Sequence, residues 1–334
     1  MASHIEELKA KARKNPKTIV LPEGNEPRVL EAASRIASSG AARVILVGKE
    51  KNINSLAKKS SITLGDVRII DPETYPHLEE MVEMFYNFRK HKGVTARDAR
   101  KAVLENCVYF GALLVTREEA DGFVAGASHT TSNVARAGLY CIGLREDIKI
   151  MSSSFLIETE NCPYGDKGLF IFGDCGIVPD PNSEQLADIA ISTARLYEEF
   201  FGHLPRVALL SYSTKGSARG ASVDKVLGAL ECIRKRSPGL QVDGELQLDA
   251  AVVPDVAKIK APRSKVAGGA NVLIFPNLDS GNIACKLVQR LGNARVVGPL
   301  LQGLKKPGSD LSRGCLVEEI VDAVVATCVR AQVC

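Results

Sequence analysis

The chain has 334 residues, of which 45% are hydrophobic and 25% are charged, and its formal net charge is +4. This length is typical of about two domains that each bury a core. The weak, dispersed charge and the lack of an RNA-binding or helix-turn-helix signature argue against a nucleic-acid partner. No apolar run approaches the roughly 18 residues that span a membrane, so we expect no membrane partner.

The first segment, residues 1–17, alternates acidic and basic residues where a signal peptide would need an apolar core. It predicts an amphipathic surface helix. The nine cysteines include no CxxC pair, and their odd number favours reduced thiols over a disulfide framework. These features together favour a cytoplasmic protein. No paired Cys/His spacing indicates a zinc site, so we expect no metal.

Short β-branched runs alternate with helical patterns along the chain. Strands are predicted at residues 17–22, 42–48, 67–71, 121–126, 148–157, 168–174, 206–213 and 270–277, and a run at 294–300 precedes the last helix. Apolar residues recur with helical spacing at 26–40, 183–201 and 222–237 and in a last helix near the C-terminus. This alternation predicts an α/β fold with a mostly parallel sheet. No Pro/Gly-rich linker marks a domain boundary, and the first crossing is expected near 144–149.

Three predicted strands are followed by loops rich in hydroxyl, amide and basic side chains. Ligands of parallel α/β folds bind at such loops, where strand ends meet helix N-termini. The candidate binding residues are Ser128, Thr130, Thr131 and Arg136 in the first loop, Ser213 and Lys215 in the second, and Asn282 and Lys286 in the third. Together these side chains suit a phosphate-bearing small molecule. The alternative is that they only cap helices, and His129 in the first loop allows the same alternative.

None of these loops carries a named catalytic or phosphate motif. The chain lacks G-x-x-x-x-G-K-[ST], which disfavours a P-loop ATPase, and no G-x-G-x-x-G follows a predicted strand, which disfavours a nicotinamide cofactor. There is no G-x-S-x-G elbow, and the five scattered histidines do not define a Ser-His-Asp triad.

The last predicted helix has an unusually polar start at Ser312 and Arg313. If Ser312 caps that helix, the free N–H groups that follow it, the helix dipole and the Arg313 guanidinium form an anion site. Glu319 lies seven residues beyond Ser312. In a helix, this spacing places the two side chains on nearly the same face. A capped helix with a surface glutamate explains the same pattern, and the pattern alone leaves both interpretations open.

Six blocks of sequence, in this order, resemble the phosphate acetyltransferase (phosphotransacetylase) family. The blocks are "YNFRKHKG", "ADGFVAGASHTTSNVARAG", "LLSYSTKGSA", "DGELQLDAA", "FPNLDSGNIACKLVQRL" and "GPLLQGLKKPGSDLSRGC". The likeness runs from "TIVLPEG" to the last helix, over nearly the entire chain. Long members of the family carry an extra N-terminal region, and this chain resembles the short, catalytic-only form.

What the resemblance implies is reversible transfer of an acetyl group between acetyl phosphate and coenzyme A, with phosphate as the other product. It implies two three-layer α/β domains of the isocitrate-dehydrogenase-like type with an interdomain cleft, and a homodimer. Domain I is expected at 1–146 plus 296–334, and domain II, inserted and dimerising, at 147–295. Coenzyme A is a substrate in this family, so the resemblance implies no cofactor.

The family's functional residues are carried over by position. Its catalytic Ser-Arg pair falls on Ser312 and Arg313, and two arginines that bind coenzyme A and the acyl phosphate fall on Arg89 and Arg136. Its general base is an aspartate, and this chain has Glu319 at that position. The extra methylene moves the carboxylate by about one bond length, which puts its reach in question although its acidity hardly changes. Direct thiolate attack in a ternary complex is expected, in preference to an acyl-enzyme on a cysteine.

Three other functions remain open from the sequence. Butyryl or another acyl group is an alternative substrate on the same scaffold. A non-catalytic module that senses acetyl-CoA, like the similar region of some malic enzymes, belongs to a different class. A metal-dependent decarboxylating dehydrogenase would need a cluster of metal-binding carboxylates, which the sequence does not reveal.

Overall fold

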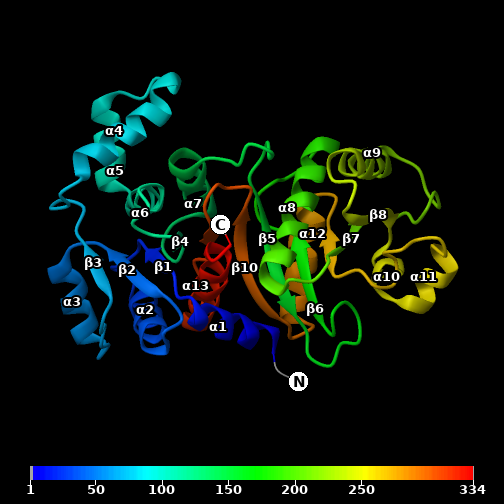
Figure 1. Ribbon diagram of the computed structural model, residues 1–334, viewed down its shortest axis with the longest axis horizontal. Helices are drawn as coiled ribbons and strands as arrows, with labels where there is room; N and C mark the ends of the chain where they lie inside the picture. The colour runs from blue at the N-terminus through cyan, green and yellow to red at the C-terminus, as the bar shows by residue number, and fades with distance from the viewer. Residues whose placement is uncertain (1–2, 334) are drawn as a thin grey trace. The chain divides into compact units, whose positions relative to one another are not determined.

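The computed structural model describes residues 3–333, and its contacts divide the chain into two compact units. The discontinuous unit comprises His4–Arg145 and the segment that begins at Leu304, whereas the inserted unit comprises Glu146–Gly303 with Ser3. Each unit consists of strands with helices packed against them (Figure 1). The α/β class predicted from the alternating pattern is confirmed.

The discontinuous unit contains five parallel strands in the order β3-β2-β1-β4-β11. These strands are β1 Thr18–Leu21, β2 Arg43–Val47, β3 Arg68–Ile70, β4 Gly122–Ala125 and β11 Gly308–Asp310. All four residues of β4 are buried, as expected for parallel strands covered on both faces. Strand β11 pairs with β4 in parallel, so the loops that follow these two strands leave the sheet at the same edge.

The helices of this unit begin and end at recognisable signals. Helix α2 starts with Pro27, whose fixed φ suits a first helical turn, and stops at Gly40, which has a φ of 68°. The helices are α1 His4–Lys14, α2 Pro27–Ser39, α3 Glu50–Lys59, α4 Leu78–Arg89, α5 Ala96–Glu105, α6 Cys107–Thr116, α7 Thr131–Ala137 and α13 Val317–Ala331, with short turns η1 Lys90–Lys92 and η2 Gly138–Ile142. Helix α6 packs against β1, β2 and β4, and α13 packs against β1, β4 and β11.

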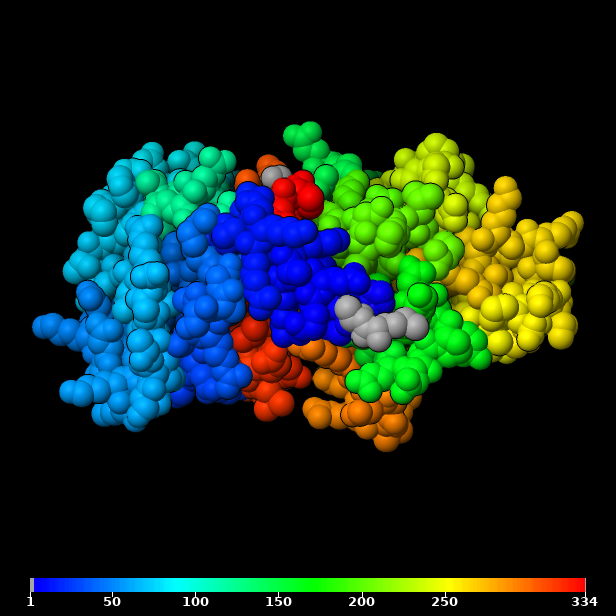
Figure 2. Space-filling model, turned by 60° about the horizontal axis from the view of Figure 1, so that its bottom comes forward, coloured from blue at the N-terminus to red at the C-terminus, as the bar shows by residue number. Residues whose placement is uncertain are grey.

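Helix α1 packs against the C-terminal helix α13. The amide of Gln332 donates hydrogen bonds to the carbonyl oxygens of Lys11 and Asn15, at 3.0 and 2.9 Å. Lys9 pairs with Glu318 at 3.1 Å. Figure 2 shows α1 on the surface with residues of the C-terminal segment on both sides of it. The predicted amphipathic N-terminal helix is therefore confirmed, and its buried residues are Ile5, Leu8 and Ala12.

The inserted unit contains six strands in the order β10-β5-β6-β9-β7-β8. Strand β5 pairs antiparallel with both β10 and β6, whereas β6, β9, β7 and β8 run parallel. The strands are β5 Ser152–Glu158, β6 Leu169–Gly173, β7 Arg206–Leu210, β8 Gln241–Leu246, β9 Val272–Ile274 and β10 Arg295–Gln302. The helices are α8 Ser183–Phe201, α9 Ala221–Arg236, α10 Leu248–Val252, α11 Pro254–Lys260 and α12 Leu278–Arg290. All eight predicted strands are present, and β8, β10 and β11 are the three that were not predicted.

Candidate active site

The turn between β11 and α13, residues 311–316, carries the two residues that the sequence singled out at the last helix. Because β11 and β4 are parallel neighbours, this turn lies beside the loop that follows β4. Gly126 opens that loop with a φ of 120°, and a Cβ there would lie 2.6 Å from the carbonyl oxygen of Leu311. Only glycine permits so close an approach of the two backbones.

Helix α13 begins at Val317, so the prediction that Ser312 caps it is wrong. Ser312 belongs to a turn in which its carbonyl oxygen accepts from the N–H of Cys315 at 2.9 Å. Its Oγ accepts from the N–H of Gly314 at 3.3 Å. The helical spacing of seven residues between Ser312 and Glu319 therefore does not apply, because the first residues of the interval are not helical.

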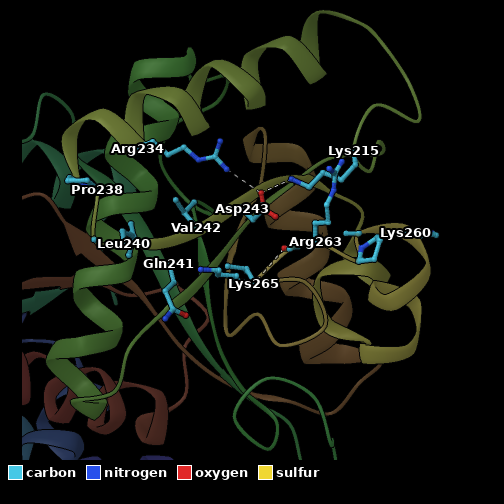
Figure 3. Close-up of a pocket in the computed structure, with 15 residues that line it drawn as sticks. Lys215, Arg234, Pro238, Leu240, Gln241, Val242, Asp243, Lys260, Arg263 and Lys265 are labelled. Carbon is cyan, nitrogen blue, oxygen red and sulfur yellow. Dashed lines mark hydrogen bonds and ion pairs between the residues drawn. The ribbon is translucent and has the colours of Figure 1, made fainter.

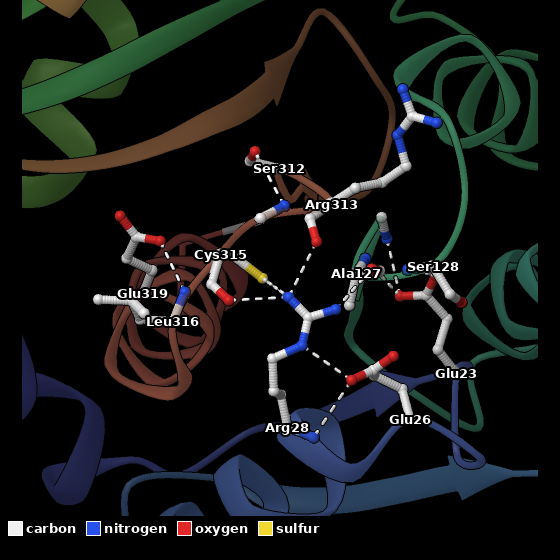
Figure 4. Close-up of polar contacts among 12 residues, drawn as sticks. Glu23, Glu26, Arg28, Ala127, Ser128, Ser312, Arg313, Cys315, Leu316 and Glu319 are labelled. Atoms are coloured by element: carbon white, nitrogen blue, oxygen red, sulfur yellow. Dashed lines mark hydrogen bonds and ion pairs between the residues drawn. The ribbon is translucent and has the colours of Figure 1, made fainter.

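Arg28 on α2, which the sequence did not single out, binds this turn. Its Nη1 donates to the carbonyl oxygens of Arg313 and Cys315 at 2.9 and 2.8 Å, and its Nη2 donates to that of Ala127 at 2.9 Å. Glu26 orients the guanidinium by accepting from Nε at 2.8 Å. Figure 4 shows this guanidinium between the turn and the loop that follows β4. One side chain thus fixes both backbones.

Glu319 reaches back to the start of its own helix. Its Oε2 accepts from the N–H of Leu316 at 2.8 Å, which satisfies one of the donors that a helix N-terminus leaves unpaired. The side chain is half-buried. In Figure 4 the side chains of Glu319 and Arg313 extend in opposite directions from the turn. Its contact with Leu316 was not predicted.

The loop after β4 is organised around the buried carboxylate of Glu23. This carboxylate accepts from four consecutive N–H groups, at residues 126–129, at 2.8 to 3.0 Å. It also accepts from the hydroxyl of Ser128, and Nδ1 of His129 lies 2.8 Å away. Burial alone would raise the pKa of Glu23, but His129 and the donors at Ser128 and Gly126 outweigh it and hold the pKa at about 2. The loop amides are therefore already bound to an anion, a side chain of the protein.

The hydroxyls at 130 and 131 also have internal partners. Thr130 caps α7 by accepting from the N–H of Asn133, as in the capping interpretation. Thr131 donates to Oδ2 of Asp310 at 2.7 Å. Asp310 is 1% exposed, and burial raises its pKa to about 7 despite the hydrogen bond from Thr131. Their binding roles remain predictions.

Arg89 and Arg136 both lie near Tyr109. The Arg89 guanidinium stacks 3.6 Å from the centroid of the Tyr140 ring. Burial raises the pKa of Tyr109, and the charges of Arg136 and Arg89 oppose that rise. Arg136 and Arg313 are both exposed. Among residues 3–333, the side chains of Arg136 and Arg313 have no hydrogen-bond or ion-pair partner, so both guanidiniums are available to an anionic ligand.

The eight predicted residues of the discontinuous unit are Ser312, Arg313, Glu319, Arg89, Arg136, Ser128, Thr130 and Thr131, and the other four belong to the inserted unit. Ser213 is fully buried and donates to Glu245 at 3.0 Å. Lys215 donates to Asp243 at 2.6 Å. Asn282 donates to the carbonyl oxygen of Cys175 at 3.0 Å, and Lys286 is exposed on α12.

The alternative of an acyl-enzyme would need a nucleophilic cysteine, such as Cys315 or Cys162. Cys315 is 3% exposed, and burial raises the pKa of its thiol to about 11, against the opposing charge of Arg28. The thiol is therefore protonated at neutral pH and is a poor nucleophile. Cys162 lies in the inserted unit and is half-buried. Within the described part of the chain, no group of three or more His, Cys, Asp or Glu side chains is arranged to hold a metal ion, and no helix is long and apolar enough to cross a membrane.

Sequence reasoning missed Glu23, Arg28 and Asp310. Glu23 lies two residues after the end of β1, and Asp310 is the last residue of β11 in the same parallel sheet; these positions were a usable signal. Arg28 gave none, because its partner carbonyls lie 285 and 287 residues away. A long-range contact between a side chain and main-chain atoms leaves no local pattern.

Comparison with known proteins supports one family. A family model described as phosphate acetyl/butaryl transferase matches residues 3–328. The phosphate acetyltransferase of Acetivibrio thermocellus is 46% identical over 330 residues, which cover 99% of this chain and 98% of that protein. That of Thermoanaerobacterium thermosaccharolyticum is 45% identical over 330 residues, covering 99% and 100%. A solved phosphotransacetylase structure from Streptococcus pyogenes aligns with a TM-score of 0.92 and 41% identity, covering 99% and 98%.

Proposed function

This chain belongs to the phosphate acetyl/butaryl transferase family, and we propose that it transfers an acetyl group reversibly between acetyl phosphate and coenzyme A. The observation that carries the proposal is the identity of 45–46% to phosphate acetyltransferases over almost the full chain. The exposed, unpaired guanidinium of Arg313 beside Ser312 supports it, because an acyl phosphate needs a cationic partner.

The reaction needs a proton acceptor for the thiol of coenzyme A. A thiol with a pKa near 8.5 is only a few per cent thiolate at about pH 7. Glu319 is assigned as the base, because its second oxygen, Oε1, has no partner among the described residues. As the proton moves to Glu319, sulfur forms a bond to the acetyl carbon, the carbon–oxygen bond to phosphate breaks, and phosphate leaves.

Negative charge grows on the carbonyl oxygen and on the departing phosphate during this step. Arg313 is assigned to stabilise that charge, and the hydroxyl of Ser312 is assigned as a second donor. Arg89 and Arg136 are assigned to coenzyme A and the acyl phosphate. Phosphate is a good leaving group, so the proposal needs neither a resident metal nor a covalent intermediate, and coenzyme A serves as substrate rather than cofactor.

The test is thioester formation by the purified full-length protein from acetyl phosphate and coenzyme A, followed by thioester absorbance. We expect turnover that requires both substrates and is unchanged by a chelator. Absence of thioester from a folded protein that still binds acetyl-CoA would overturn the proposal in favour of a sensing module. Loss of turnover with chelator, restored by a divalent ion, would overturn the metal-free assignment.

Acyl specificity is the second question, because the family description includes butaryl transferases. One extra methylene is typically worth about 10–200-fold in specificity at a fitted apolar pocket. We therefore expect kcat/KM to fall from acetyl to propionyl to butyryl phosphate. A preference of tenfold or more for butyryl phosphate would reassign the substrate.

The proposal includes a homodimer in the cytoplasm. All eight described cysteines are free thiols, as a reducing compartment would keep them. Light scattering coupled to size-exclusion chromatography should give twice the chain mass of 35.8 kDa, and a monomeric mass at assay concentration would refute the dimer. Cell fractionation should place the protein in the cytoplasm.

A further inference from the structure

A cavity of about 780 Å³ lies in the inserted unit beside β8, the edge strand of its sheet. It is lined by the start of β8, the end of α9, the loop that follows α11, and Lys215 from the loop after β7. We call it the β8 pocket (Figure 3). Its volume falls within the roughly 300–1,000 Å³ of small-molecule sites, and none of the residues assigned to acetyl transfer except Lys215 lines it.

The lining of the β8 pocket is strongly cationic. Five basic side chains and a single carboxylate line it, and the basic ones come from separate segments of the chain. They are Lys215, Arg234, Lys260, Arg263 and Lys265, and the carboxylate is Asp243. A hollow lined by one sign of charge concentrates its field and attracts small ions of the opposite sign.

Asp243 holds two of these cations over the pocket. It is 7% exposed, and its Oδ1 accepts from Nζ of Lys215 at 2.6 Å and lies 3.7 Å from Nη2 of Arg234. Figure 3 shows Lys215 and Arg234 pointing toward Asp243 from opposite sides. Lys260 is held by Asp249 at 2.7 Å. Carboxylates thus hold some of these basic groups in place, but the cations outnumber the carboxylates.

Arg263 and Lys265 supply the uncompensated charge. Both side chains are exposed, and within the described residues neither has a hydrogen-bond or ion-pair partner. Like charges that line one pocket repel one another unless an anion lies between them. Arginine binds phosphate through two parallel hydrogen bonds and lysine acts as a point charge, so this mixture suits phosphate groups.

We propose that the β8 pocket binds a small molecule that carries a phosphate chain. Several linked phosphates place multiple negative charges within one cavity and match the excess of cations. The lining also includes apolar side chains that can contact the rest of such a molecule. They are Pro238, Leu240, Val242, Pro262 and Val266. Acetyl phosphate has a single phosphate group, whereas coenzyme A, the other proposed substrate, carries a diphosphate, so the test separates the β8 pocket from the acetyl-transfer site by competition.

The test is calorimetric titration of the full-length protein with inorganic tripolyphosphate, without acetyl phosphate or coenzyme A. We expect saturable binding that weakens at least tenfold in the double variant Arg263→Glu/Lys265→Glu. A matched control is Lys51→Glu combined with Lys101→Glu, which makes the same change in net charge on exposed helix positions of the discontinuous unit. We expect this control to bind within twofold of the natural chain. ATP in place of tripolyphosphate tests whether the apolar lining adds affinity.

Four results would overturn the proposal. The first is no saturable binding of either probe by the natural chain. The second is equal weakening by the pocket and control variants, which would indicate only a general charge effect. The third is tight binding of a short single-stranded DNA with none of tripolyphosphate, which would indicate a nucleic-acid surface. The fourth is displacement of tripolyphosphate by equimolar acetyl phosphate or coenzyme A, which would place the probe in the acetyl-transfer site. Thermal unfolding of each variant checks that it is folded.

Discussion

Replacing Arg28 by lysine removes the side chain that joins the turn at 312–315 to the loop after β4. The guanidinium donates to three main-chain carbonyls, and such charged hydrogen bonds contribute about 1.5–3 kcal/mol each when buried. The side chain is 31% exposed, so we discount each to about 1 kcal/mol. One ammonium cannot reach all three carbonyls, and the loss of about 2 kcal/mol would lower the equilibrium constant for ordering the turn roughly thirtyfold.

We therefore expect Arg28→Lys to lower kcat of thioester formation by about tenfold to a hundredfold, because the turn carries Ser312 and Arg313. The melting temperature should fall by only a few degrees, since the opening is local. Arg35→Lys is the matched control on the same helix, because Arg35 is exposed and contacts only carboxylates, Glu31 and Glu318. A kcat within twofold of the natural chain for Arg28→Lys would refute this reasoning.

Four further predictions concern single side chains. Arg313→Ala should lower kcat by about 10²–10³, with folding unchanged by circular dichroism. Glu319→Gln should lower the rate near pH 7 by about 10²–10⁴, and the deficit should shrink as pH rises past the thiol pKa near 8.5; a constant deficit at all pH would remove Glu319 as the base. Because the pKa of Glu23 is lowered to about 2, its charge stabilises the fold above the unfolded pKa near 4.5 and this contribution is lost as pH falls toward 2. Glu23→Gln should therefore cost up to about 3 kcal/mol in urea unfolding at about pH 7 and progressively less below about pH 4.5. The Cys315→Ala variant should keep most of the activity in the thioester assay. Loss of activity in this variant would support an acyl-enzyme route.

The fold was largely predictable because most strands are continuous runs of buried apolar residues. The three missed strands break this rule, and β10 does so with Gly298 and Pro299 in its middle. Strand β8 contains Asp243 and Glu245, both buried, and β11 contains Ser309 and Asp310. Each of these four residues is bonded to a side chain elsewhere in the chain. A buried polar strand is stabilised by such partners, and its own sequence does not display them.

The candidate site was predictable in its residue types and only partly in its geometry. The Ser312 turn was assigned to a helix because local spacing cannot reveal hydrogen bonds from a residue far away in the sequence, such as Arg28. Likewise, Ser128 was expected to face a ligand, whereas its N–H and hydroxyl are bonded to the buried Glu23. In each case the deciding partner lies far away in the sequence.

The pairing of β11 with β4 has a consequence for biosynthesis. Strand β4 ends at Ala125, and its neighbour, which ends at Asp310, is made only after the whole inserted unit. At about 5–20 residues per second, the edge of β4 stays uncovered on the ribosome for roughly 10–40 seconds. During that interval a buried apolar strand has a free edge, which is a template for aggregation. The segment that carries Ser312 and Arg313 also covers this edge. Completion of the strand pairing and assembly of the candidate site therefore occur in the same folding step.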